Sequence, residues 1–307
     1  MLDVLHLSFH HHTRNSISKI VSNLLKCCPV EQYHINLPME IDDLALLINK
    51  SKPKILHFHF NSLLNIEKLL DELDYKPVCI QTLHADIASK CPDLMDKIIC
   101  IHKPCYDKND PAKSVIIENT VDVDVHLEVG KKDVCSSFRF VPIRVNKPII
   151  KAYESIQGSV HLFGELPNNP YMKQVYGFLK PDTNITICPY SNSMEKTLSD
   201  YKIYVFYLDE ETNHSNYCYG LCVMEASASG IPVVAIQRSQ NYQKYIKNGY
   251  NGFIVSDAVE FKQACDRLLN DSEFYSVVKA NAIDNAKSLD NCMPKLYGKL
   301  YSEFLER

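Results

Sequence analysis

The sequence predicts an α/β protein built on two parallel sheets. Short apolar runs of strand length alternate with amphipathic helical patterns along the chain, which is the sequence form of βαβ units. The chain has 307 residues, more than a single domain usually contains. The alternation stops in a polar, poorly patterned stretch between Asn119 and Phe138 and then starts again. We therefore expect two domains, each with its own sheet, and a boundary near residue 130.

The first half contains apolar runs with the length and composition of buried strands. They are Val4–Phe9, Tyr33–Leu37, Ile55–Phe60, Val78–Leu83, Ile98–Ile101 and Val115–Ile117. Helical patterns separate the early runs, within Ser16–Cys27, Asp42–Lys50 and Leu63–Leu73. Because parallel strands need a crossover between them, this order predicts a parallel sheet.

The second half repeats the pattern. Its strand-like runs are Phe138–Ile143, Val160–Phe163, Ile185–Cys188, Ile203–Tyr207, Pro232–Ile236 and Phe253–Val255. Three helical patterns close the chain, namely Val259–Leu269, Glu273–Lys287 and Pro294–Leu305. A second parallel sheet follows from this order.

Composition excludes several classes of protein. The formal charge is −4 and no long Lys/Arg run is present, so nucleic-acid binding is not expected. The sequence contains no stretch of about 18 to 20 consecutive apolar residues, the length that spans a membrane. Asp3, His6 and the His10–His12 triplet interrupt the apolar stretch that a secretory signal needs. We expect a cytoplasmic protein with no transmembrane segment, and peripheral contact with a membrane stays open.

The 12 cysteines are scattered without a C-x-x-C pair, which favours reduced thiols that pack as small hydrophobic groups. G-x-G-x-x-G, Walker and G-x-S-x-G motifs are absent from the sequence, so dehydrogenase, P-loop and serine-hydrolase functions lack their residues. The three consecutive histidines at 10–12 do not have the spacing of a metal site, and we expect no metal.

The most informative segment is 217–236. It reads as a turn at Gly220, a short helix with the single carboxylate Glu225, a helix end at Gly230 and a buried strand. Glycine lets the backbone approach a ligand closely, and a helix N-terminus attracts anions through its N–H groups and its dipole. The segment therefore predicts an anionic ligand.

This segment resembles the donor-site signature of the retaining, GT-B-fold sugar transferases of glycosyltransferase family 4 (glycosyl transferases group 1), written E-x7-E-A-x-A-x-G-x-P-V-V. Glu225 occupies the second glutamate position, and Gly220 and Leu221 the usual Gly-Leu. The stretch 248–255 is similar to the turn and strand that follow in the family. Tyr217 stands at the first glutamate position and Lys244 where another glutamate is common.

The resemblance implies the GT-B fold, two Rossmann-like domains facing across a cleft. Residues 1–130 would form the acceptor-side domain and residues 131–290 the nucleotide-sugar-binding domain. The segment 291–307 would be a helix that crosses back to the first domain. The stretch 118–122 is similar to the family segment that closes the N-terminal domain.

Further candidate residues follow strand-like runs, where ligands bind in open α/β sheets. Arg144 and Lys147 resemble the family's cations that clamp a nucleotide diphosphate. His84, in Thr82–Asp86, resembles a strand end that faces the donor sugar, and it is the candidate catalytic residue. His57 and His59 alternate with phenylalanines, which favours a packed strand.

The resemblance implies a retaining, metal-independent glycosyltransferase, hexosyl- or related, of glycan biosynthesis. It would move a sugar from a UDP- or GDP-linked donor to a hydroxyl acceptor, which would be a glycan, a lipid or a small molecule, without a cofactor. The donor-binding residues would be Arg144, Lys147, Tyr217, Gly220, Leu221 and Glu225. Tyr217 and Lys244 keep open a non-catalytic module that binds a nucleotide or glycan, or serves as a scaffold. A nucleotide-sugar epimerase is the third hypothesis.

Overall fold

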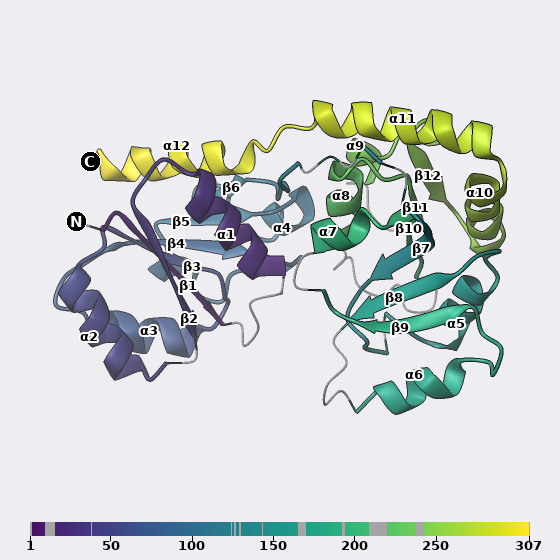
Figure 1. Ribbon diagram of the computed structural model, residues 1–307. Helices are drawn as coiled ribbons and strands as arrows, with labels where there is room; N and C mark the ends of the chain where they lie inside the picture. The colour runs from purple at the N-terminus through teal and green to yellow at the C-terminus, as the bar shows by residue number, and fades with distance from the viewer. Residues whose placement is uncertain are drawn as a thin grey trace. The chain divides into compact units, whose positions relative to one another are not determined.

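The computed structural model divides into two compact units, drawn in Figure 1. Unit 1 comprises Met1–Thr120 and Asn291–Arg307, and unit 2 comprises Val121–Asp290. The structure describes the whole chain except residues 1, 10–15, 38, 124, 126, 129, 143, 165–169, 192–193, 209–219, 237–241 and 307. Each unit is built on one six-stranded sheet whose paired strands are all parallel.

The sheet of unit 1 has the order β2-β1-β3-β4-β5-β6. Its strands are β1 (Val4–Phe9), β2 (Gln32–Leu37), β3 (Ile55–Phe58), β4 (Val78–Leu83), β5 (Lys97–Cys100) and β6 (Ser114–Ile116). The helices are α1 (Ser16–Cys27), α2 (Ile41–Ser51), α3 (Leu63–Asp71), α4 (Lys103–Tyr106) and α12 (Met293–Leu305), with a short 3-10 turn at Pro92–Leu94. The predicted strands of this half are confirmed.

The two faces of this sheet differ in chemistry. Helices α2 and α3 cover one face and α1 and α12 the other (Figure 1). Leu5, Leu7 and Phe58 belong to the apolar core that includes α2 and α3. Since side chains alternate along a strand, the intervening His6 and His57 point to the opposite face, where both meet Tyr301 of α12. One face of the sheet is therefore apolar. The other, where His6 and His57 alternate on their strands with the buried Val4 and Ile55, is mixed, and we call it the polar layer.

The sheet of unit 2 has the order β12-β11-β10-β7-β8-β9. Its strands are β7 (Lys132–Ser137), β8 (Val160–Gly164), β9 (Ile185–Pro189), β10 (Tyr201–Phe206), β11 (Val233–Ile236) and β12 (Gly252–Val255). The helices are α5 (Lys147–Glu154), α6 (Met172–Phe178), α7 (Met194–Leu198), α8 (Leu221–Ala228), α9 (Tyr242–Tyr245), α10 (Ala258–Asn270) and α11 (Ser272–Ser288).

One strand prediction was wrong. The expected run was Phe138–Ile143, but its described residues, 138–142, do not form a strand, and β7 lies six residues earlier at Lys132–Ser137. Four of the six residues of β7 are polar, so it lacks the apolar character expected of a central strand. Its buried hydroxyls form hydrogen bonds with tyrosines that are distant in sequence. Ser136 Oγ lies 3.2 Å from Tyr153 Oη, and Ser137 Oγ lies 3.1 Å from Tyr204 Oη. Hydrogen bonds of this kind remove the cost of burying polar groups.

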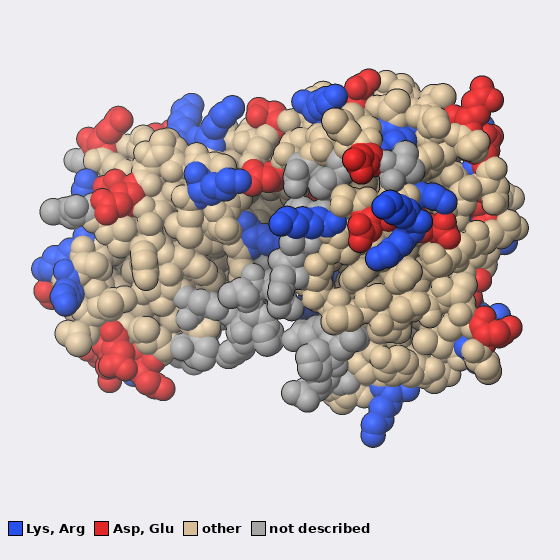
Figure 2. All heavy atoms as spheres, in the orientation of Figure 1, with Lys and Arg blue, Asp and Glu red and all other residues tan. Residues whose placement is uncertain are grey.

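Two further expectations concern the surface. Within the part of the chain that the structure describes, no helix is long and apolar enough to cross a membrane. On the face drawn in Figure 2, Lys and Arg side chains lie among Asp and Glu side chains in both units. Mixed charge of this kind fits the small net charge of −4.

Candidate functional site

The topology of unit 2 points to one place in its sheet. The chain adds β8 and β9 on one side of β7 and then returns to add β10, β11 and β12 on the other side. The neighbours β7 and β10 therefore form the topological switch point. Connections that leave the carboxyl ends of these two strands run in opposite directions and open a crevice, where open α/β sheets bind their ligands.

Buried tyrosines join the carboxyl ends of the two strands. The Tyr204 hydroxyl of β10 accepts a 3.2 Å hydrogen bond from the Ser137 N–H at the end of β7. Tyr153 of α5 lies between Ser136 of β7 and the Tyr207 N–H, which donates to its hydroxyl at 3.1 Å. Burial raises the pKa of both phenols, so they remain neutral. The floor of the crevice is therefore fixed by hydrogen bonds that cross the switch point.

The connection after β7 carries Arg144 and Lys147. A tight turn places Arg144, whose N–H donates to Val141 O at 2.8 Å, and its side chain is half-buried. Asn146 then caps α5 by accepting a 3.0 Å hydrogen bond from the Ile149 N–H. Lys147 is the first residue of α5 and is exposed. A guanidinium, an ammonium and a helix N-terminus thus follow the same strand, and all three attract anions.

The connection after β10 ends at Gly220, the N-cap residue immediately before α8. Gly220 has φ +76°, a left-handed conformation that side chains disfavour. A Cβ at this position would lie 2.2 Å from Cε1 of Tyr242, a fully buried residue. Gly220 O accepts hydrogen bonds from Val223 at 2.9 Å and Met224 at 3.0 Å. The N–H groups of Leu221 and Cys222 come just before these two, in the first turn, where a helix provides no backbone acceptor for its N–H groups.

Helix α8 carries a single carboxylate, Glu225, on a helix that is otherwise uncharged. Val223, Met224 and residues 226–228 are buried, whereas Leu221, Cys222 and Glu225 are half-buried. Residues three and four apart share a helix face, so Glu225 lies on the same face as Leu221 and Cys222 of the first turn. One face of α8 therefore combines backbone donors at its start with a carboxylate one turn later.

The far end of α8 is held in place by α11, which runs over it in unit 2 (Figure 1). Lys279 of α11 is buried, and its ammonium donates a 3.0 Å hydrogen bond to Gly230 O, just past the helix end. Burial lowers the pKa of Lys279 to about 8. A cation at a helix C-terminus is favourable, so Lys279 helps to fix the axis of α8.

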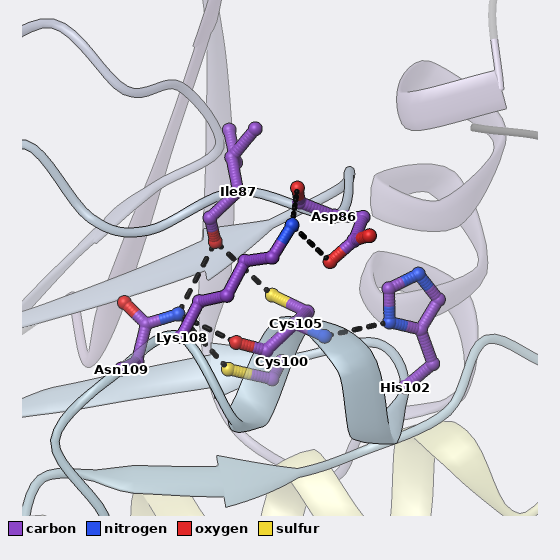
Figure 3. A network of polar contacts seen from close by, with 7 residues as sticks. All are labelled: Asp86, Ile87, Cys100, His102, Cys105, Lys108 and Asn109. Atoms are coloured by element: carbon purple, nitrogen blue, oxygen red, sulfur yellow. Dashed lines mark hydrogen bonds and ion pairs between the residues drawn. The ribbon is translucent and has the colours of Figure 1, made fainter. Parts of the chain in front are cut away.

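In unit 1, His84 directly follows β4. The loop that comes next in the chain, with Asp86 and Ile87, is anchored by a polar network (Figure 3). Lys108 pairs with the Asp86 carboxylate at 2.9 Å and donates to Asp86 O at 2.9 Å. Asn109 donates to Ile87 O at 3.2 Å and to Cys105 O at 2.7 Å. These contacts tie the loop to α4, so His84 stands on a fixed strand end.

The polar layer of unit 1 contains further histidines. His6, His57 and His59 are buried, and one ring nitrogen of each lies within 4.8 Å of those of the others. Among the residues described, they are the group whose spacing could hold a metal ion. Each of their six ring nitrogens already has a hydrogen-bonding partner in the protein. Burial lowers the pKa of all three rings, to about 4 for His6.

Known structures are similar in fold to this chain. A glycosyltransferase from Rickettsia africae ESF-5 is similar over 100% of this chain and 99% of its own, with 13% identity and a TM-score of 0.73. Anabaena Alr3699/HepE in complex with UDP and glucose is similar over 99% of this chain and 100% of its own, with 11% identity and a TM-score of 0.75. AviGT4, a glycosyltransferase involved in avilamycin A biosynthesis, is similar over 100% and 98%, with 11% identity and a TM-score of 0.67.

The chain has the GT-B fold. Residues 143–271 also match the sequence family described as "Glycosyl transferases group 1". No curated protein sequence matches the chain. The matched segment lies within unit 2. It contains Arg144 and Lys147 at the end of the connection after β7 and the whole connection from β10 to α8, so the family likeness and the crevice derived from topology overlap.

Most of the expected site residues fall on two connections of one GT-B domain. Arg144 and Lys147 follow β7, and Gly220, Leu221 and Glu225 follow β10. Lys244, at another family glutamate position, is exposed on α9. Tyr217 and the His10–His12 triplet lie outside the described residues. His84 belongs to unit 1, and its role stays a prediction.

Sequence reasoning missed the residues that support this site. Tyr153 and Tyr204 fix the crevice floor and Lys279 fixes α8, yet each acts on a residue at least 17 positions away. Gln32 and Tyr301 engage the buried histidines over similar or longer separations. No local pattern could have found them, because their partners meet only in the folded chain.

Proposed function

We propose that this GT-B protein is a retaining, metal-independent glycosyltransferase that moves a sugar from a UDP- or GDP-linked donor to a hydroxyl acceptor. The observation that carries the proposal is helix α8 at the switch point, which begins at the left-handed Gly220 and presents Glu225 one turn later. The match of residues 143–271 to glycosyl transferases group 1 supports it. Anabaena HepE, a structural neighbour, has been solved with UDP and with UDP-glucose, which favours a uridine donor.

In this proposal Glu225 holds the ribose, because a carboxylate can accept hydrogen bonds from both ribose hydroxyls. The backbone amides of Gly220 and Leu221 bind the diphosphate, together with Arg144 and Lys147. A guanidinium and an ammonium supply the positive charge that the leaving diphosphate needs. We therefore assign charge neutralisation to these side chains rather than to a metal ion.

The proposed reaction keeps the configuration at the anomeric carbon. The acceptor oxygen bonds to that carbon on the face that the diphosphate leaves, and the carbon–oxygen bond to phosphate breaks. The acceptor proton passes to a phosphate oxygen of the leaving group. No protein base is needed, so the protein contributes positioning and electrostatic stabilisation. His84 would contact the donor sugar, and Tyr217 would line the space where family members place a glutamate.

The variant Glu225→Gln tests the role of the carboxylate. A neutral amide retains one acceptor oxygen but loses the charge, so binding of UDP and of the donor should weaken by roughly 1.5–3 kcal/mol. Isothermal titration calorimetry measures the loss. Glu273→Gln is the matched control, because Glu273 is an exposed glutamate in the first turn of α11 of the same unit. Unchanged affinity in a folded Glu225→Gln protein would remove Glu225 from the site.

Donor turnover distinguishes the proposed transferase from the other hypotheses. A transferase consumes the nucleotide sugar and releases nucleoside diphosphate faster when an acceptor is present. An epimerase converts the sugar without releasing nucleoside diphosphate. A binding module binds the nucleotide in calorimetry and turns nothing over, and this outcome would refute the enzymatic function while leaving the site intact.

A further inference from the structure

A row of hydrogen-bonded rings crosses the polar layer of unit 1. His6 Nε2 lies 2.8 Å from Gln32 Oε1, and His6 Nδ1 lies 3.0 Å from His59 Nε2. His59 Nδ1 in turn lies 3.0 Å from His84 Nε2. The row therefore runs from Gln32 at the start of β2, through β1 and the residue after β3, to the strand end that carries His84. Every link joins two side chains, so each proton position depends on its neighbour.

Gln32 sets the direction of the row. Its amide nitrogen donates to Leu24 O at 3.1 Å and to Cys28 O at 3.4 Å, two carbonyls at the end of α1. Carbonyl oxygens only accept, so the NH₂ group must face them and Oε1 must face His6. His6 Nε2 can meet this oxygen only as a donor. The proton of His6 is therefore on Nε2.

The assignment then passes from ring to ring. His6 and His59 are neutral, because burial holds the pKa of His6 near 4 and that of His59 well below its usual value. A neutral imidazole with a proton on one nitrogen accepts on the other. His6 Nδ1 thus accepts from His59 Nε2–H, and His59 Nδ1 accepts from His84 Nε2–H. The last ring is left with a lone pair on Nδ1.

We propose that Gln32 determines, through His6 and His59, the tautomer of His84, so that neutral His84 presents Nδ1 as a hydrogen-bond acceptor. His84 then recognises a group that donates a proton, such as a hydroxyl, and does not donate from Nδ1 to a phosphate or carboxylate oxygen. This step rests on the proposed transferase and deepens it, because it names the chemistry that His84 recognises as that of a hydroxyl and not of a phosphate. Gln32, His6 and His59 are positioning residues.

A second row in the same layer supplies a control. His57 Nδ1 lies 2.7 Å from the Tyr301 hydroxyl, and His57 Nε2 lies 2.7 Å from Thr82 Oγ1, which is 3.1 Å from the Tyr297 hydroxyl. These hydroxyls can donate or accept, so they impose no direction. Among the residues that the structure describes, no hydrogen bond joins one row to the other. Removal of the Tyr301 hydroxyl should therefore leave the tautomer of His84 unchanged.

A metal ion is the competing explanation for the histidines. A cation bound by His6, His57 and His59 would need a lone pair on each ring, and His6 Nδ1 already uses its lone pair to accept from His59. Bound metal would break this link and leave the row without a direction. Elemental analysis of the purified full-length protein therefore tests the proposal, because one equivalent of tightly bound zinc would overturn it.

Nuclear magnetic resonance of protein labelled with ¹⁵N-histidine reads the tautomers directly, since protonated and unprotonated ring nitrogens resonate far apart. His84→Gln identifies the signals of His84 by their loss. In the wild-type protein we expect the proton of neutral His84 on Nε2. In Gln32→Met, which removes the anchoring oxygen, the Nδ1–H form of His84 should become populated. Tyr301→Phe should resemble the wild type.

A wild-type His84 with its proton on Nδ1 would overturn the proposal whether or not any variant folds. So would an unchanged His84 tautomer in a Gln32→Met protein whose circular dichroism matches the wild type. The readout needs no substrate, so it separates the two proposals. If the tautomers are as stated and no donor is consumed, the proposed function fails and the role of Gln32 stands.

Discussion

The variant Gly220→Ala tests the geometry of the crevice at one methyl group. Two separate effects add at this position. A residue with a side chain in the left-handed region costs about 1–2 kcal/mol. The new Cβ would also lie 2.2 Å from Cε1 of the fully buried Tyr242, and overpacking of this kind costs about 1–3 kcal/mol. We expect the free energy of unfolding of unit 2 to fall by roughly 2–5 kcal/mol.

Gly249→Ala separates the two effects. Gly249 has φ +74°, almost the same as Gly220, but a Cβ there would meet nothing within 4 Å. This variant should lose only the backbone part, about 1–2 kcal/mol. The difference between the two variants isolates the contact with Tyr242. Urea unfolding followed by circular dichroism measures both losses.

The same pair of variants separates stability from binding. Gly220→Ala must displace the first turn of α8 or the Tyr242 ring, so UDP affinity should fall in calorimetry. Gly249→Ala should keep wild-type affinity. Equal losses of stability in the two variants would show that the backbone at Gly220 relaxes away from Tyr242. Unchanged UDP affinity in Gly220→Ala would show that the start of α8 does not bind the diphosphate.

Three further predictions concern charge. Arg144→Ala should weaken binding of UDP far more than binding of uridine in calorimetry, because its proposed partner is phosphate, and equal losses would assign Arg144 to folding. Lys279 has a pKa of about 8 in the folded protein and 10.5 as a free side chain. Below pH 8 it is therefore protonated in both the folded and the unfolded protein. Between pH 8 and 10.5 it is protonated only in the unfolded protein. The unfolding free energy should therefore rise over this window by up to roughly 3 kcal/mol, and Lys279→Met should lack that rise in urea titrations at a series of pH values. Tyr217→Glu should impair turnover of the native donor while UDP affinity persists, and unchanged kinetics would place Tyr217 away from the sugar.

Local patterns were enough to predict most strands and the turn and helix of the proposed binding segment. An apolar run between turn residues is buried wherever it lies in the sheet, so runs such as Val78–Leu83 could be recognised without their neighbours. The segment from Gly220 to Glu225 was recognisable for a similar reason. The left-handed glycine, the helix start and the carboxylate are all neighbours in the chain, so their chemistry is already visible in one short stretch.

Contacts between distant residues decided the rest. Strand β7 is polar, and it is stable as a central strand because Tyr153 and Tyr204 satisfy Ser136 and Ser137. The direction of the histidine row depends on Gln32, whose amide is oriented by helix α1 and whose partner His6 lies 26 positions away. A buried polar group is stable only when its partners meet it in the right orientation. Those partners come from different elements, so their identity follows from the fold and not from the order of residues along the chain.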